Sequence, residues 1–231
     1  MEVISDARSK NIPVNIIEAD VFAKTINKVF SGARFSAEDI SSTQGIIASV
    51  SNYNYRDLDI DLKNGTVLSK NSIIVILDEI TDVGNFGAIL RNCSAFGADG
   101  VIISKNRSVE VSNRVSKISS GALEEIRVYN AVNIVSTIVK LKEHGFWVYG
   151  TKLGTEEQIV TADSLEYVFP LAIVFGSEGK GIGKLVEKNC DFLVKIEMPG
   201  RMQSLNVSTS SGIMLYLINQ YRGKNSQASV K

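Results

Sequence analysis

Cysteine, histidine and net charge are all scarce in this chain of 231 residues, and each scarcity excludes a class of protein. The two cysteines, Cys93 and Cys190, give neither a disulfide framework nor the spacing of a metal site, which favours a reduced, cytoplasmic protein. Lysine plus arginine and aspartate plus glutamate both number 25, so no overall positive field attracts nucleic acid. Any contact with RNA therefore needs a local basic patch, and no Ser/His/Asp set, acid pair or metal cluster is evident.

Long apolar runs are also absent. No run approaches the roughly 20 residues that cross a bilayer, and the N-terminus lacks the apolar stretch of a signal peptide, so no membrane association is expected. A hydrophobic content of 44% and a mean hydropathy of +0.08 fit a soluble globular protein that can bury a sizeable core. The length allows one large domain, or one domain with a smaller companion.

Residues 1–68 differ from the rest of the chain in their pattern of apolar and polar residues. Residues 12–19 and 43–50 have the pattern of short strands, a helical pattern follows Asp20, and residues 53–66 fit a linker or a short helix. This region is too small and too poor in strands for an independent fold, so it is either a lobe of the main body or a trimmed domain. At the other end, residues 224–231 form a polar tail that we expect to be flexible.

From Ser72 onward, strands and helices alternate regularly. Asn133 and Gly145 have the positions of an N-cap and of a helix-ending glycine, and Trp147 and Tyr149 are expected in the core. Because the strands are apolar and β-branched, residues 69–223 predict an α/β fold with a parallel sheet covered by helices on both faces. The expected strands are 73–78, 101–104, 126–129, 146–151, 171–175 and 192–196. The expected helices are 86–96, 134–143, 182–189 and 206–221, with a helical turn at 115–119.

A glycine cluster, G-S-E-G-K-G-I-G, follows the apolar strand that ends near Phe175. It lacks the G-K-[ST] step of a Walker loop, and it lies too late in the chain for a dinucleotide fingerprint, which argues against ATP and NAD. Glycines here allow the backbone to bend sharply and to approach a ligand closely. A flexible strand-to-helix turn without a ligand is the alternative.

A second polar stretch, D-E-I-T-D-V-G-N-F-G-A-I-L-R-N, covers residues 78–92. Asn85 has the position of a helix N-cap, and Gly87 allows close packing in the first turn. Arg91 follows one turn later, where it can face a ligand bound at the strand ends. The alternative is a surface arginine paired with Asp82 or Glu79.

A third stretch, S-L-N-V-S-T-S-S-G, begins at Ser204, and helix capping alone explains a serine or an asparagine at such a position. Four basic residues follow the strand at 101–104 and could contact RNA phosphates, although such scattered charges usually form a solvated surface. They are Lys105, Arg107, Arg114 and Lys117. The single histidine, His144, fits a helix C-terminus, where the helix dipole favours it.

Taken together, N-F-G-A-I-L-R-N, V-F-G-S-E-G-K-G-I and M-P-G-R-M-Q-S-L-N-V-S resemble the three ordered motifs of the SpoU (TrmH-like) RNA ribose 2′-O-methyltransferases of the SPOUT superfamily. The resemblance covers residues 73–222 and is closest to bacterial enzymes that modify a guanosine of large-subunit rRNA. It implies a homodimer whose C-terminal segment is threaded into a deep trefoil knot, an exception to the rule that proteins are unknotted. It also implies that residues 1–68 contain a partial RNA-binding lobe.

In that family S-adenosylmethionine binds bent in the knot, and no metal is needed. By position, its adenosine side would contact four residues of this chain: Thr151, Gly176, Ile196 and Leu205. The polar positions of the motifs fall on five residues: Asn85, Arg91, Glu178, Ser204 and Asn206. In the mechanism proposed for the family, the motif arginine takes the proton of the ribose hydroxyl. This would require a neutral arginine, whereas arginine stays protonated in proteins. We therefore expect Arg91 to hold a phosphate and to polarise the hydroxyl. Ser204 and Asn206 would orient either the ribose or Arg91.

The chain departs from the family pattern in four places. Val83 and Glu197 stand where prolines are usual, and Thr43 replaces a histidine. The N-terminal lobe lacks its first strand and helix. Two alternatives stay open: a tRNA or antibiotic-resistance rRNA methyltransferase, and a non-catalytic RNA-binding or ribosome-assembly protein on the same fold.

Overall fold

The computed structural model describes residues 2–29, 43, 45–48, 52–67 and 69–228, in two compact units, Met1–Asn52 and Tyr53–Lys231. The smaller unit contains helices α1 (Glu2–Ser9) and α2 (Ala19–Val29). The strand expected at 12–19 is wrong, because residues 12–18 form no regular element and α2 begins at Ala19. Of the strand expected at 43–50, residues 43 and 45–48 are not in a strand, and residues 44, 49 and 50 lie outside the described residues.

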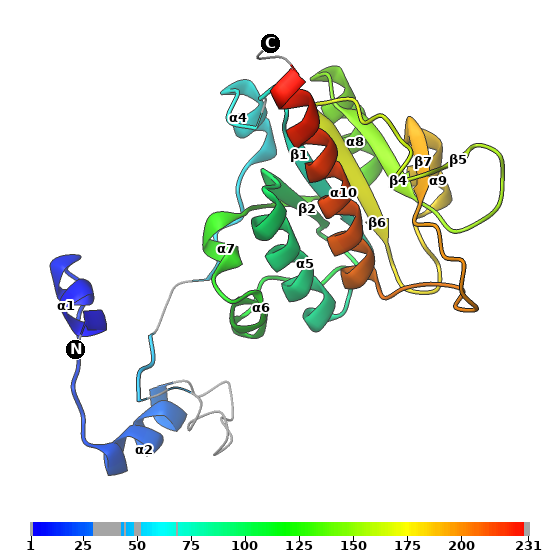
Figure 1. Cartoon of the computed structure of the whole chain (residues 1–231). Coiled ribbons are helices and arrows are strands. Elements are labelled where there is room, and N and C mark those ends of the chain that lie inside the picture. Colours follow the sequence, from blue (N-terminus) through cyan, green and yellow to red (C-terminus); the bar gives the residue numbers. More distant parts are fainter. Residues whose placement is uncertain (1, 30–42, 44, 49–51, 68, 229–231) are drawn as a thin grey trace. The chain divides into compact units, whose positions relative to one another are not determined.

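The larger unit is built on a seven-stranded sheet with the order β3-β2-β1-β6-β4-β7-β5, in which all paired neighbours are parallel (Figure 1). The α/β class and the parallel sheet are therefore confirmed. Because all strands run in one direction, their carboxyl ends meet at a single edge of the sheet. The strands are β1 (Ile73–Asp78), β2 (Gly100–Ser104), β3 (Arg127–Ala131), β4 (Trp147–Thr151), β5 (Ile159–Thr161), β6 (Leu171–Gly176) and β7 (Phe192–Lys195).

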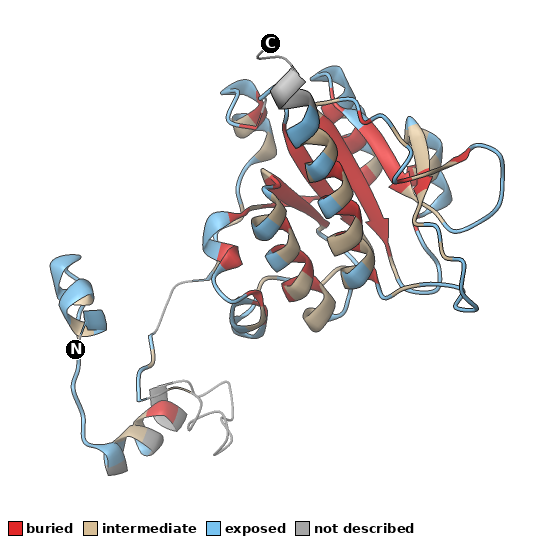
Figure 2. Cartoon of the chain, in the orientation of Figure 1, coloured by how far each residue is buried: buried red, intermediate tan, exposed pale blue. Residues whose placement is uncertain are grey.

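Helices cover both faces of this sheet and enclose two apolar cores (Figure 2). In β1, Ile73, Val75 and Leu77 face one core, whereas Ile74 and Ile76 face the other, as the alternation of a strand requires. Burying each such side chain contributes about 1.5–3 kcal/mol. One face carries α5 (Val83–Phe96), α6 (Asn113–Ser119), α7 (Ala122–Glu125) and α10 (Val207–Ala228). The other carries α4 (Leu58–Lys63), α8 (Ile134–Glu143) and α9 (Lys184–Asn189).

Residues 53–67 pack as part of the larger unit, which begins at Tyr53. They contain the short helix α4, whose Leu62 is only 1% exposed. The hydroxyl of Tyr129 on β3 donates to the carboxylate of Asp61 at 2.8 Å. At the C-terminus, α10 continues to Ala228, so residues 224–228 of the expected tail are helical.

The helix α8 matches its prediction, with Asn133 accepting a hydrogen bond from the Ser136 N–H and Gly145 at φ 86° after the last turn. His144 caps that helix, as expected. Trp147 is a correction: it lies at the first position of β4 with 42% of its surface exposed. None of the helices in the described part of the chain has the length and apolar character needed to cross a bilayer.

Candidate functional site

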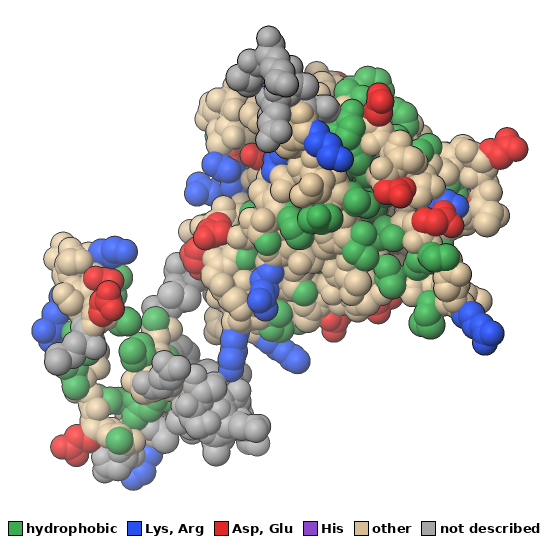
Figure 3. Space-filling model, in the orientation of Figure 1, with side chains coloured by type: hydrophobic (Ala, Val, Ile, Leu, Met, Phe, Trp, Pro, Cys, Tyr) green, Lys and Arg blue, Asp and Glu red, His purple; other side chains and the backbone are tan. Residues whose placement is uncertain are grey.

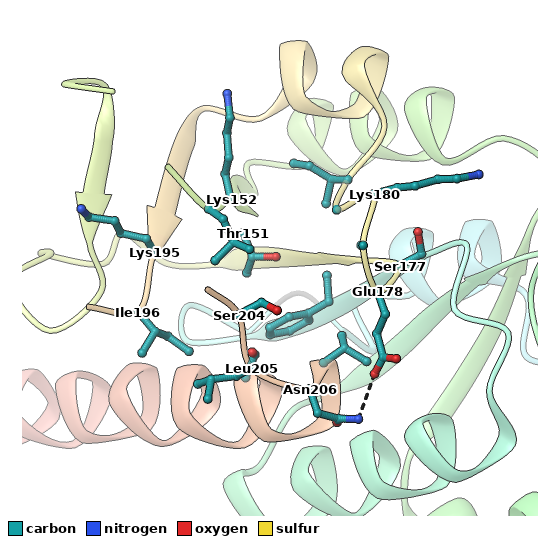
Figure 4. Close-up of a pocket in the computed structure, with 18 of the residues that line it drawn as sticks. Thr151, Lys152, Ser177, Glu178, Lys180, Lys195, Ile196, Ser204, Leu205 and Asn206 are labelled. Carbon is teal, nitrogen blue, oxygen red and sulfur yellow. Dashed lines mark hydrogen bonds between the residues drawn. The ribbon is translucent and has the colours of Figure 1, made fainter. Parts of the chain in front are cut away.

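A cavity of about 670 Å³ opens at the carboxyl ends of β4, β6 and β7 (Figure 4). Most of its wall comes from four segments: residues 151–153 at the end of β4, the end of β6 with the turn after it, residues 194–198 at the end of β7, and residues 203–207 at the start of α10. Glu187 on α9 and two further residues of α10, Ser210 and Met214, complete it. The carboxyl edge of a parallel sheet is where α/β proteins bind ligands, and this volume suits a ligand of nucleoside size.

The wall after β6 is a tight glycine turn, residues 177–183, which we call the glycine turn. Gly181 donates its N–H to the Ser177 carbonyl at 2.9 Å and has φ 67°, a conformation that favours glycine. The chain folds back so closely that a Cβ on Gly176 would lie 2.0 Å from the carbonyl carbon of Gly181. Glycine is therefore required at position 176, and backbone groups form this part of the cavity surface.

Three side chains from separate segments meet beside this turn. Glu178 Oε1 accepts hydrogen bonds from the Asn85 amide at 3.0 Å and from the Asn206 amide at 2.8 Å. The Asn206 amide also donates to Asn85 Oδ1 at 2.9 Å, which closes a three-membered network (Figure 4 draws its Asn206–Glu178 bond). The network joins α5, the glycine turn and the start of α10.

The start of α10 is fixed by a second group of polar contacts. Asn206 Oδ1 accepts from the N–H of Ser208 at 2.8 Å and from its hydroxyl at 2.5 Å. On α5, the Asn92 amide donates to the Ser208 carbonyl at 2.8 Å and to the hydroxyl of the buried Ser211 at 2.9 Å. Asn206 is thus a helix cap and a member of the network at once.

A charged cluster lines another part of the wall. Lys152 Nζ lies 2.9 Å from Glu187 Oε1 and 3.4 Å from Glu156 Oε1. The hydrogen bond to Glu187 is the main cause that raises the pKa of Lys152 above its usual value. In Figure 4 the Lys152 side chain points away from the Glu178–Asn206 network, so the cavity has two distinct polar regions.

The model of the SpoU rRNA Methylase family matches residues 72–216, most of the larger unit. A Bacillus subtilis protein, YacO, named for the TrmH family of tRNA/rRNA methyltransferases, is 41% identical over 182 residues, which cover 79% of this chain and 71% of YacO. The chain belongs to the SpoU family. It is accordingly an RNA methyltransferase.

Two solved structures agree with this. A crystal structure of an AdoMet-bound rRNA methyltransferase from Sinorhizobium meliloti has a TM-score of 0.61 at 26% identity, and the match covers 66% of this chain and 57% of that one. The TrmH/SpoU tRNA modifying enzyme from A. aeolicus has a TM-score of 0.61 at 27% identity, covering 74% of this chain and 87% of that one. S-adenosylmethionine is therefore the cofactor indicated for this SpoU protein.

Most of the residues predicted from the sequence meet at the cavity of this SpoU protein. Glu178, Ser204 and Asn206 line it, and Asn85 reaches it through Glu178. Asn85 is not the N-cap of α5, because Asp82 is: its carboxylate accepts from the Asn85 N–H at 2.7 Å. The four residues predicted to contact adenosine also line the cavity: Thr151, Gly176, Ile196 and Leu205.

Arg91 is the exception, because it does not line the cavity. It lies exposed on α5 and makes no hydrogen bond or ion pair with the residues that the structure describes. The suggested pairing with Asp82 or Glu79 is wrong, since Asp82 caps α5 and Glu79 pairs with Arg107 at 3.1 Å. A free guanidinium on the helix that carries Asn85 remains available to a second molecule.

The four basic residues are all exposed. Lys105 and Arg107 lie in the loop after β2, and Arg114 and Lys117 lie on α6. The Arg107–Glu79 pair is so exposed that it contributes no more than about 1 kcal/mol, and a phosphate can displace it. On the face seen in Figure 3, basic and acidic side chains are interspersed, in agreement with the balanced composition.

The sequence reasoning missed Lys152, Glu187, Asn92 and Ser208. The first two are separated by 35 residues and lie in no motif, so no spacing signals their pairing. Asn92 follows the motif arginine directly, and this polar residue beside the apolar positions Leu90 and Cys93 was the available signal. Within the described ranges, no group of three or more His, Cys, Asp or Glu side chains is placed to hold a metal ion.

Proposed function

We propose that this protein transfers the methyl group of S-adenosylmethionine to the 2′-hydroxyl of an RNA ribose, at a guanosine of large-subunit rRNA. The observation that carries the proposal is the convergence of three motif segments at one cavity, where Asn85, Glu178 and Asn206 are joined by hydrogen bonds. Family membership supports the same reaction class. The protein would act in the cytoplasm, where its RNA substrate is found.

The cavity fits the methyl donor in size and in chemistry. Its volume of about 670 Å³ lies within the range of nucleoside-sized pockets. Ile196 and Leu205 offer apolar contact to an adenine ring, and the close-packed backbone around Gly176 offers polar groups without side chains. When bound, S-adenosylmethionine supplies an activated methyl group, so the protein chiefly has to align acceptor and donor.

The acceptor side of the reaction falls to Arg91, Ser204 and Asn206. Arg91 holds an RNA phosphate and polarises the ribose hydroxyl, since a guanidinium presents several donors but is already protonated and cannot act as a base. The hydroxyl proton therefore leaves to the phosphate that Arg91 holds or to water. Ser204 and Asn206 orient the ribose. This division of roles is supported by the exposure of Arg91 and by the position of the other two at the cavity wall.

RNA outside the target nucleotide is held by Lys105, Arg107, Arg114 and Lys117, together with residues 1–52. Phosphate contacts of this kind fix the position of an RNA without reading its sequence. Their exposure and their place near the carboxyl edge of the sheet support this assignment. Binding should weaken steeply with salt.

We infer that the working unit is a homodimer and that the C-terminal segment forms a trefoil knot. The α5–α10 surface supports the dimer: Tyr216 is 49% exposed and contacts Phe96 edge-on, leaving apolar surface that a second copy would cover. Light scattering during gel filtration tests the dimer. A knot would keep the fully unfolded chain, pulled by its termini, measurably shorter than the ~3.3–3.6 Å per residue of an unknotted chain.

A transfer assay tests the function. Purified protein, tritium-labelled S-adenosylmethionine and unmodified large-subunit rRNA should give labelled RNA, whereas Arg91→Ala should lose at least about 100-fold in rate. Lys63→Ala, an exposed cation on α4, is the matched control. Transfer to tRNA alone favours the tRNA alternative, and RNA binding without transfer in either form favours the assembly protein.

A further inference from the structure

Asp78 ends β1 at the sheet edge where the cavity opens. Its Oδ2 accepts a hydrogen bond from the backbone N–H of Gly183 at 2.8 Å, a contact between positions 105 residues apart. We propose that Asp78 is a positioning residue that fixes the glycine turn and thereby shapes the cavity for the methyl donor. The inference rests on the proposed function, because it concerns the same cavity.

The sheet register explains why Asp78 can do this. Asp78 pairs with Gly176 in the parallel β1–β6 ladder, so its carboxylate stands beside the point where the glycine turn leaves β6. Seven residues later the turn returns to Gly183, the residue before α9. Gly183 has no side chain that could contact its surroundings, and its backbone N–H donates to the Asp78 carboxylate. The leaving end of the turn is therefore fixed by the sheet. At the returning end, the Asp78 carboxylate adds a link to β1 beside the Gly181–Ser177 hydrogen bond and the buried side chain of Ile182.

The position of the glycine turn determines the shape of the cavity wall and the position of Glu178. Glu178, Gly181 and Ile182 line the cavity, whereas Asp78 and Gly183 do not. Glu178 also holds the amides of Asn85 and Asn206. If the link to β1 is lost, the returning end loosens, and both the cavity wall and Glu178 lose part of their support. Asp78 thus acts on the donor through the turn and not by contact.

The chain contains a matched control at the opposite edge of the sheet. Asp99 Oδ2 accepts from the N–H of Ile73, the first residue of β1, also at 2.8 Å. The bond has the same chemistry and the same length as that of Asp78, but it lies at the amino end of the strand. Removing it tests the general cost of losing such a bond without touching the cavity edge.

The experiment compares wild type, Asp78→Ala, Asp78→Asn and Asp99→Ala, with Asp78→Ser in place of the alanine variant if that variant does not fold. Calorimetry with S-adenosylhomocysteine measures binding, and hydrogen exchange on the cofactor-free protein measures the amides of residues 177–183. We expect Asp78→Ala to weaken binding roughly tenfold and to speed exchange in the turn, because a hydrogen bond to a charged acceptor is lost.

Asp78→Asn keeps an acceptor oxygen and should bind within about threefold of wild type, and Asp99→Ala should change neither binding nor exchange in the turn. Unchanged binding and exchange in Asp78→Ala, equal weakening in Asp99→Ala, or no rescue by asparagine would each overturn the proposal. Wild type that does not bind S-adenosylhomocysteine would instead count against the proposed function, and the exchange data would still decide the role of Asp78.

Discussion

The side chain of Asn206 makes two kinds of contact at once, a helix cap and a bond to the polar network. Its Oδ1 caps α10 through Ser208, while its Nδ2 joins Glu178 and Asn85. Helix capping and a functional role were alternatives at the level of sequence. In the structure the amide oxygen caps the helix, while the amide nitrogen joins the network beside the cavity, so the two are compatible. A residue of this kind is identified from its spacing, but its contacts depend on segments far away in the chain.

Asn206→Ala should lower the methyl-transfer rate on the order of 100-fold, because the network that orients the reacting groups is opened and small misplacements are costly. Initial rates with saturating RNA and donor measure the effect. Asn189→Ala removes an asparagine whose amide bonds only locally to Leu185, and it should stay within twofold of wild type. Equal rates in all three proteins would contradict this account of the network.

The two cysteines should be unreactive in the folded protein. Burial raises the pKa of the Cys190 thiol to about 12, and burial likewise raises the pKa of Cys93, which is 0% exposed. Since the thiolate is the reactive form, Ellman's reagent at pH 8 should detect no thiol within minutes and two after denaturation. One rapidly titrating thiol in the native protein would contradict this prediction.

At the scale of elements, the glycine turn depends on close backbone contact. Gly176→Ala should abolish measurable S-adenosylhomocysteine binding, because the added Cβ would lie 2.0 Å from the Gly181 backbone. Gly200→Ala is the control, since a Cβ at that position meets nothing within 4 Å. Calorimetry on both variants checks the prediction, and binding by Gly176→Ala at the wild-type affinity would refute the packing argument.

Most elements of the larger unit could be predicted because their apolar runs are long and periodic. The start of α5 was placed at Phe86 and not at Val83, since Asn85 and Asp82 are both good caps and only the geometry selects Asp82. The strand β5 was missed because Ile159–Thr161 is too short to give a pattern. The false strand at 12–19 shows that β-propensity is weak without a neighbouring strand.

At the scale of the whole molecule, the sequence predicted which segments form the site but not their order in the sheet. That β4 lies between β6 and β7 depends on non-local pairing, which no local pattern encodes. For the same reason Arg91 was expected at the cavity, whereas it lies exposed on α5. Most of the motif residues line the cavity, and the chain path determines the distances between them.

The stability of the larger unit should fall above pH ~10. Burial is the main cause that raises the pKa of five tyrosines, and Tyr129 also donates to Asp61. These tyrosines therefore lose their protons at a lower pH in the unfolded chain than in the native protein. Their contribution to the free energy of unfolding is complete below pH ~10 and declines above it. The other four are Tyr53, Tyr55, Tyr149 and Tyr167.

Urea unfolding at pH 9 and pH 11 measures this decline. Tyr129→Phe should reduce it, whereas Tyr216→Phe, at a half-exposed position, should not. A pH-independent free energy of unfolding across this range, or an equal effect of both variants, would contradict the prediction.

The central claim concerns the oxygen that receives the methyl group. RNA labelled by the protein with tritiated S-adenosylmethionine can be hydrolysed in alkali, which cleaves after every unmodified ribose but not after one that carries a 2′-O-methyl group. We predict that the label is recovered in alkali-resistant dinucleotides whose 5′ nucleoside is 2′-O-methylguanosine. Label recovered only in mononucleotides, on a base, would contradict the account.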